Sequence, residues 1–255
     1  MNIQWDAEKY TSNFSFVHKY GNSVTELIEA PEGSRVLDLG CGNGALTGVL
    51  KDQGFQVIGL DDSKNLLSVA KKYFPDLEFI HADATDFSLK EQVDVVFSNA
   101  VFHWIDREKQ SDMLRCVYKA LKGNGEFGFE FGGYGNNRLI HGALAKAFAE
   151  QGYFYQVPFY FPSIGEYASL LEQAGFEVRY AVLFDRMTEL MGEDGMKDWI
   201  RMFISTPFYA VSEEAQREAI RNRAVELLKK DLYRDGKWYA DYVRLRMRAI
   251  KGGRK

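Results

Sequence analysis

Two patterns of apolar residues alternate along the chain. Short continuous apolar runs, such as residues 93–98, are typical of strands buried on both faces of a sheet. Between them, apolar residues recur at three- and four-residue intervals, which predicts amphipathic helices. The predicted strands are 35–39, 56–60, 77–81, 93–98, 125–131, 176–185 and 239–250, and the predicted helices are 45–52, 64–73, 108–121, 136–151, 163–174, 196–204 and 213–230.

This alternation predicts an α/β fold with right-handed crossovers and a doubly wound, mostly parallel sheet of seven strands. Residues 189–236 interrupt it, because they contain two or three helices, broken at Pro207, and no strand. We therefore expect a helical insertion before the last strand. The expected divisions are an N-terminal helical lid segment 1–30, a core 31–188, a helical cap insertion 189–236, and a final core strand with tail 237–255.

Charged and apolar residues alternate along the last predicted strand. Arg244, Arg246 and Arg248 would all point to one side of that strand. The pattern is consistent with an exposed sheet face or with a sheet edge that is shielded by charge.

A glycine-rich turn follows the first predicted strand, in the segment VLDLGCGNG at residues 36–44. Glycines at 40, 42 and 44 would let a ligand approach the backbone, and the N–H groups at the start of the next helix suit polar or anionic groups. Asp61 ends the next apolar strand, about 20 residues later, where a ribose hydroxyl partner is expected in such folds. The third glycine is at 44 and not at 45, so the turn differs from the dinucleotide fingerprint. The segment predicts a nucleotide-binding turn.

Composition narrows the classes of partner. The net charge is −4, which argues against a nucleic-acid or anionic-membrane surface. No apolar run approaches the roughly 20 residues that span a bilayer, and the polar N-terminus lacks a signal-peptide segment, so we expect a cytoplasmic protein. Cys41 and Cys116 are too few for a metal site or a disulfide framework, and we expect both to be reduced. We expect no metal, a small-molecule substrate, and a monomer or homodimer.

Five short motifs occur in order at the spacing of βα units: VLDLGCGNG, VIGLDDS, HADATDF, FSNAVFHWI and LKGNGEF. This series, from about Arg35 to Phe131, resembles that of class I S-adenosylmethionine-dependent methyltransferases. The chain also resembles the trans-aconitate methyltransferase-like branch, in its N-terminal Trp-to-Tyr segment, its His-Trp pair and its helical insertion. The resemblance implies S-adenosyl-L-methionine as cofactor and S-adenosyl-L-homocysteine as product.

The resemblance also implies roles for individual residues. Asp61 would accept hydrogen bonds from both ribose hydroxyls, with Asp62 as an alternative, and Asp38 would hold the methionine amino group. Asp38 could instead accept hydrogen bonds from the turn backbone. At the adenine, Asp83 would accept from the amino group and Ala84 would donate its N–H, unless Asp83 is simply a loop acid. The predicted cofactor-binding residues are Asp38, Gly40, Cys41, Gly42, Asn43, Gly44, Asp61, Asp62, Asp83, Ala84 and Asn99.

The methyl acceptor is less constrained. His103 could be a general base, a residue that orients the substrate, or a helix cap. An arginine beside aromatic residues could bind a carboxylate through two hydrogen bonds, and Arg138, Arg186 and Arg201 are candidates, unless they form surface ion pairs. The predicted substrate-binding residues are Trp5, Tyr10, Phe14, Trp104, Tyr134, Trp199 and Arg201.

The expected activity is methyl transfer from S-adenosylmethionine to a small molecule by in-line displacement. We favour a carboxylate oxygen as acceptor, because it needs no base. The alternatives are methylation of a phenol, an amine or a macromolecule, and a cofactor-binding module without catalysis.

Overall fold

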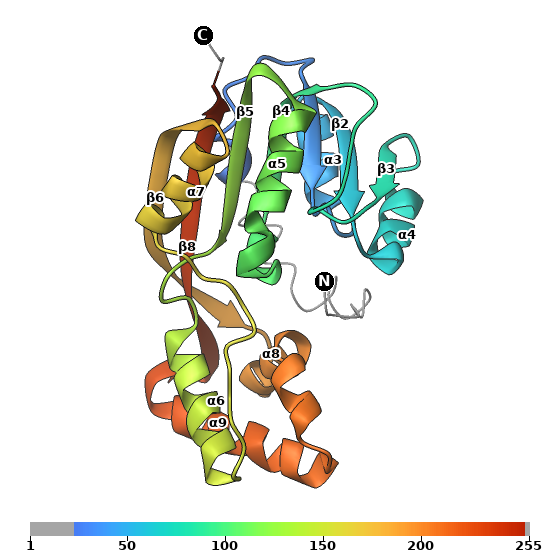
Figure 1. Ribbon diagram of the computed structural model, residues 1–255. Helices are drawn as coiled ribbons and strands as arrows, with labels where there is room; N and C mark the ends of the chain where they lie inside the picture. The colour runs from blue at the N-terminus through green and yellow to red at the C-terminus, as the bar shows by residue number, and fades with distance from the viewer. Residues whose placement is uncertain (1–22, 253–255) are drawn as a thin grey trace.

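The computed structural model describes residues 23–252, and the statements below concern that part of the chain. Its helices and strands follow the predicted order (Figure 1). The strands are β1 Arg35–Leu39, β2 Gln56–Asp61, β3 Glu78–His81, β4 Val93–Asn99, β5 Leu121–Gly132, β6 Phe176–Leu190, β7 Tyr233–Arg234 and β8 Lys237–Lys251. The helices are α3 Ala45–Asp52, α4 Lys64–Tyr73, α5 Gln110–Ala120, α6 Arg138–Glu150, α7 Ile164–Gln173, α8 Gly195–Phe203 and α9 Glu214–Leu232, with 3₁₀ turns η1 Phe102–Trp104, η2 Arg107–Lys109 and η3 Thr206–Ala210.

The strands form one open, mostly parallel sheet, in the order β3-β2-β1-β4-β5-β8-β6. The first five are mutually parallel, and β8 runs antiparallel to both of its neighbours. This confirms the predicted fold class. The described part adds an eighth strand, the two-residue β7, which pairs with the start of β8 across an Asp235–Gly236 turn. Both turn residues have positive φ, as the common two-residue hairpin turn requires.

Helices cover both faces of the sheet. On one face, α5 and α7 bury their apolar side chains against β4, β5 and β8. On the other face, α3 and residues 23–28 pack against β1, β2 and β4. The strand residues are buried on both sides, which explains why the sequence shows them as continuous apolar runs.

The strands β6 and β8 are longer than predicted, with 15 residues each. They pair along almost their whole length and extend below the other strands, where α6, α8 and α9 pack around them (Figure 1). Buried residues of these strand ends, such as Leu190 and Trp238, join the apolar cluster of the helices. The two strands therefore connect the sheet to a helical region.

The arginines of the last strand have a different environment from the one predicted. β8 lies between β5 and β6, so it is not an edge strand, and the side chains of Arg244, Arg246 and Arg248 are largely buried. Arg246 and Arg186 both bind the carboxylate of Glu130, which is 2% exposed. The prediction of an exposed or edge-shielding row was wrong, because alternation along a strand does not reveal a buried acid on its neighbour.

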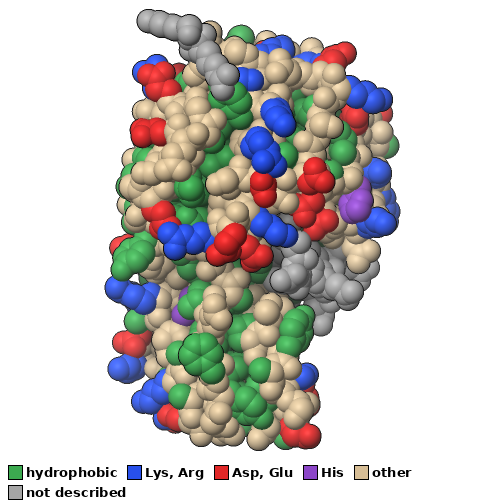
Figure 2. Space-filling view, in the orientation of Figure 1, with side chains coloured by type: hydrophobic (Ala, Val, Ile, Leu, Met, Phe, Trp, Pro, Cys, Tyr) green, Lys and Arg blue, Asp and Glu red, His purple; other side chains and the backbone are tan. Residues whose placement is uncertain are grey.

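The molecular surface in Figure 2 shows basic and acidic side chains interspersed over the sheet region. No large area of one sign gathers on this face, in keeping with the small net charge of −4. Within residues 23–252, no helix combines the length and the apolar character that a membrane crossing needs.

Candidate active site

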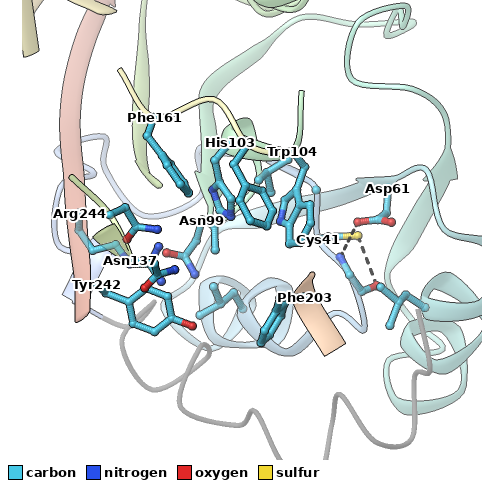
Figure 3. Close-up of a pocket in the computed structure, with 18 of the residues that line it drawn as sticks. Cys41, Asp61, Asn99, His103, Trp104, Asn137, Phe161, Phe203, Tyr242 and Arg244 are labelled. Atoms are coloured by element: carbon cyan, nitrogen blue, oxygen red, sulfur yellow. Dashed lines mark hydrogen bonds between the residues drawn. The ribbon is translucent and has the colours of Figure 1, made fainter. Parts of the chain in front are cut away.

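A pocket opens at the carboxyl ends of the parallel strands, between the sheet and the helical region (Figure 3). Asp38 of β1, Asp61 of β2 and Asn99 of β4 line it. Neighbouring β1 and β4 continue into connections on opposite sides of the sheet, and such a switch point is where open α/β sheets bind ligands. The pocket encloses about 1020 Å³ of empty space, including solvent at its mouth.

The glycine turn between β1 and α3 forms one wall of the pocket. Gly40, Gly42 and Gly44 have φ values of 78°, 56° and 80°, which only glycine adopts without strain. A Cβ at Gly40 would also overlap the side chain of Val101. The Gly42 N–H donates to Asp61 Oδ2 at 2.9 Å. This bond connects the turn to the end of β2.

Two buried carboxylates lie at this end of the pocket. Asp38 is 2% exposed and Asp61 is 6% exposed. Asp38 Oδ2 accepts from the Thr47 hydroxyl at 2.7 Å, and Asp61 Oδ1 accepts from the Ser63 N–H at 2.8 Å. Burial raises the pKa of Asp38 to about 7, against the lowering effect of the Thr47 hydrogen bond and with a further increase from nearby Asp61. Burial also raises the pKa of Asp61.

Within the described residues, no lysine or arginine forms a salt bridge with either carboxylate. Buried acids without a cationic partner favour a ligand that brings positive charge of its own. S-adenosylmethionine carries an ammonium and a sulfonium group, so the chemistry of this end fits that cofactor.

The opposite end of the pocket contains the positively charged side chain of Arg244 and the side-chain amide of Asn137, which can donate hydrogen bonds. Arg244 of β8 is 7% exposed, and its guanidinium lies 4.3 Å from the centroid of the Tyr242 ring. Figure 3 shows Arg244, Asn137 and Tyr242 at one end of the pocket and Asp61 and Cys41 at the other, with Asn99 between them. The pocket is therefore electrostatically polarised.

His103, on η1, lies between these two ends. Its Nδ1 accepts from the Gly132 backbone N–H at 3.4 Å, so the neutral ring carries its proton on Nε2. Burial lowers the pKa of His103 well below its usual value, and Arg244 lowers it further. A neutral imidazole protonated on Nε2 donates a hydrogen bond from that atom and cannot remove a proton with it. The geometry thus favours orientation of the substrate over general-base catalysis.

Aromatic side chains enclose the remainder of the pocket. Trp104 of η1 packs edge-on against Phe159 of the loop before α7, with ring centroids 4.8 Å apart. On the opposite side, Trp199 of α8 donates its indole N–H to the Tyr242 hydroxyl at 2.6 Å. The aromatic residues that line the pocket are Trp104, Phe159, Phe161, Trp199, Phe203 and Tyr242, which we call the aromatic wall.

The structure brings together nine of the residues singled out from the sequence. The ones that line the pocket are Asp38, Gly40, Cys41, Gly42, Asp61, Asn99, His103, Trp104 and Trp199. The ones that do not line it are Asn43, Gly44, Asp62, Asp83, Ala84, Tyr134 and Arg201. The remaining three, Trp5, Tyr10 and Phe14, are outside the described residues.

Several residues outside the lining have other contacts. Tyr134 is 66% exposed, and Arg201 binds Glu218 at the surface. Asp83 accepts hydrogen bonds from Thr85, and Ala84 is buried in the apolar core. These positions give Tyr134 and Arg201 no support as substrate-binding residues, and we leave both out of the proposed site.

None of the three candidate arginines lines the pocket, and Arg201 forms the surface ion pair that was its alternative. Arg186 binds Glu130 and Arg138 is exposed, whereas the pocket arginine is Arg244. Asn136 and Asn137 at the start of α6 also line the pocket and were missed. The sequence shows the alternating arginines of β8, but it does not show that β8 extends beyond the sheet and passes the pocket.

In the part of the chain that the structure describes, no three histidine, cysteine or acidic side chains gather as a metal site would require. Both cysteines are free thiols.

Comparison with known proteins agrees with the geometry. Residues 36–125 match a family described as a methyltransferase domain. The chain is 33% identical to an uncharacterized methyltransferase of Schizosaccharomyces pombe, over 97% of this chain and 98% of the relative. It is 26% identical to a trans-aconitate 2-methyltransferase of Rhizobium etli, over 98% of this chain and 100% of that protein.

Among solved structures, phosphoethanolamine N-methyltransferase 2 of Haemonchus contortus, in complex with S-adenosyl-L-methionine, shares the fold at a TM-score of 0.58 and 15% identity. The alignment covers 99% of this chain and 61% of that one. The extended match to the yeast protein, together with the glycine turn, the acidic strand ends and the sheet order, shows the family. The chain belongs to the class I S-adenosylmethionine-dependent methyltransferases.

Proposed function

We propose that this methyltransferase acts on a small molecule and that the accepting atom is a carboxylate oxygen. The observation that carries the proposal is the buried Arg244 at the end of the pocket opposite the two acids. A guanidinium binds a carboxylate through charge-assisted hydrogen bonds, often two at once. The relatives named trans-aconitate 2-methyltransferase, whose named substrate is a carboxylate, support the same choice.

The cofactor would lie along the carboxyl ends of β1, β2 and β4. Asp61 would accept hydrogen bonds from the ribose hydroxyls, because a carboxylate has acceptor sites beyond the two that Gly42 and Ser63 use. Asp38 would neutralise positive charge on the methionine part. The cofactor supplies an activated methyl group: the carboxylate oxygen bonds to the methyl carbon, the electron pair of the broken carbon–sulfur bond stays on sulfur, and a methyl ester forms without release of a proton.

The residues of the chain then have to align the acceptor and exclude water. Arg244 would hold the carboxylate, and His103 would donate from Nε2 to one of its oxygens. Neither group needs to change its protonation state during the transfer, which agrees with the lowered pKa of His103.

Replacement of Arg244 tests the proposal. We expect the purified protein to methylate small carboxylic acids in a panel that also contains phenols, amines, tRNA and protein. Arg244→Gln should raise KM for the acid on the order of 100-fold, since it removes the charged partner of a buried carboxylate. Labelled methyl transfer measures the rate, and calorimetry should show unchanged cofactor affinity.

Arg248→Gln is the matched control. Arg248 is on the same side of the same strand, but it pairs with the exposed Glu29 and does not line the pocket. It should leave KM unchanged. Methylation of a phenol, an amine or a macromolecule, with no transfer to any acid, would refute the carboxylate acceptor.

A further inference from the structure

We infer that the acceptor is a monocarboxylate with a sizeable apolar body, such as an aryl or medium-chain aliphatic acid, and not a compact polycarboxylate. This inference rests on the proposed function and specifies its substrate class. It is carried by the charges that line the pocket and by the continuity of the aromatic wall.

The first observation concerns charge. Among the lining residues within 23–252, Arg244 is the one whose side chain is positively charged at neutral pH. His103 is neutral, because burial and Arg244 lower its pKa. The other charged groups in the lining are the carboxyls of Asp38 and Asp61. One guanidinium can pair with one carboxylate, so each further carboxylate of a polyacid would find no second cation among these described lining residues and would face two acids.

The second observation is the geometry of the aromatic wall. Its rings form an unbroken series in which neighbouring centroids lie 4.8 to 6.3 Å apart, in the order Phe161, Phe159, Trp104, Phe203, Trp199 and Tyr242. The series begins beside His103, whose ring centroid is 6.0 Å from that of Phe161. It ends beside Arg244, whose guanidinium lies over the Tyr242 ring.

The wall therefore starts and ends at the two groups that would hold the carboxylate. Its members come from η1, the loop before α7, helix α8 and strand β8, so segments distant in sequence build one apolar surface. Figure 3 shows the His103, Trp104, Phe161, Phe203 and Tyr242 rings around the same cavity. Aromatic rings gain most from a ligand that is itself apolar. A compact polyacid would cover this surface with charge.

The first experiment compares substrates. We expect kcat/KM for octanoate or cinnamate to exceed that for trans-aconitate or citrate on the order of 100-fold, since each extra buried carboxylate lacks a cation. Labelled methyl transfer to each acid, at saturating cofactor, gives the values. A tricarboxylate that reacts as well as or better than the monocarboxylates would overturn this inference and leave the carboxylate acceptor standing. Absence of transfer to any acid would overturn both.

The second experiment changes the wall. Phe203→Ala opens space at α8 and should shift the preference toward longer chains, raising the ratio of kcat/KM for dodecanoate over octanoate about tenfold. Phe208→Ala is the control, because Phe208 is a buried aromatic residue of the same apolar cluster that does not line the pocket. It should cost stability and leave the ratio unchanged. An unchanged ratio in folded Phe203→Ala, checked by its melting temperature, would contradict the placement of the apolar body against the wall.

Discussion

At the residue scale, the acids at the ends of β1 and β2 have different local roles. Asp61 binds the backbone of the glycine turn and of the residue before α4, so it also holds the local fold. Among residues 23–252, the side chain that donates to Asp38 is that of Thr47, and burial strongly disfavours the charged form of Asp38. Asp38 is therefore the more sensitive probe of a positively charged ligand.

Cofactor affinity should depend on pH through Asp38. Its pKa of about 7 in the folded protein lies above the ordinary value of 3.8, so the unliganded protein favours the protonated form below pH 7. A cationic ligand favours the ionised form, and affinity should thus rise with pH up to about 7, approaching tenfold per pH unit, and then level off. Titration calorimetry between about pH 5.5 and 8 measures this.

The same shift predicts the opposite trend for stability without ligand. A raised carboxyl pKa contributes stability at low pH that is lost as the pH rises through the folded-state value. Asp38→Asn should flatten the affinity profile, whereas Asp76→Asn, at an exposed position, should retain it. Equal slopes for both variants would exclude Asp38 as the titrating group.

At the scale of elements, local sequence signals place the first βα units well. β1, α3 and α4 have the predicted bounds, because glycines, prolines and caps mark their ends. Ser63 caps α4 and Ser163 caps α7, each accepting from an N–H three residues on. Residues 122–124, which lie between a predicted helix and a predicted strand, instead belong to an irregular part of β5, where Asn124 has φ 61° and the pairing with β4 shifts register.

Alanine substitutions at two glycines can separate the cost of a steric overlap from the cost of a strained backbone conformation. Gly40 and Gly236 have nearly equal φ values of 78° and 76°, but a Cβ at Gly40 would overlap Val101 and one at Gly236 would meet nothing within 4 Å. Gly236→Ala should cost about 1 kcal/mol of unfolding free energy, and Gly40→Ala about 1–3 kcal/mol more. Urea denaturation measures both.

The added cost at Gly40 should be partly recovered in the double variant Gly40→Ala, Val101→Ala, which removes the overlapping methyl groups. Equal losses for the two single glycine variants would show that packing against Val101 contributes nothing.

At the scale of the whole molecule, one buried ion cluster ties three strands together. Glu130 of β5 accepts two hydrogen bonds from Arg186 of β6 and one from Arg246 of β8. Arg246 also donates to Ser23, on the segment that covers this face of the sheet. β6 and β8 continue from this cluster into the helical region, and β8 contributes Tyr242 and Arg244 to the pocket lining. The cluster therefore fixes the position of the strand that carries these two residues.

Removal of the charge on Glu130 should destabilise the protein strongly. Glu130→Gln leaves two largely buried guanidinium groups without their carboxylate, and we expect a loss of about 3 kcal/mol of unfolding free energy. Glu177→Gln on β6 removes an exposed pair with Arg179 and should have little effect. Comparable denaturation midpoints for the two variants would rule out a structural role for the cluster.

The sequence alone determined the family, the alternation of strands and helices in the parallel part, and the glycine turn with its two acids. These features follow from local signals, namely apolar periodicity, glycine spacing and carboxylates at strand ends. All of these signals lie in one segment of about 100 residues, from Arg35 to Phe131. The candidate residues that line the pocket come mainly from this segment, as Asp38, Gly42, Asp61 and Asn99 illustrate.

Only the tertiary structure decided how the acceptor end is built. Arg244 is buried beside His103 because β8 inserts between β5 and β6 and extends below the sheet, and Trp199 and Phe203 join them because α8 packs onto that extension. These contacts join residues that are far apart in the sequence, the Trp199–Tyr242 hydrogen bond spanning 43 positions, and no local pattern encodes such a distance. A periodic pattern specifies which side of a strand is apolar, but the partner of that side is set by long-range packing.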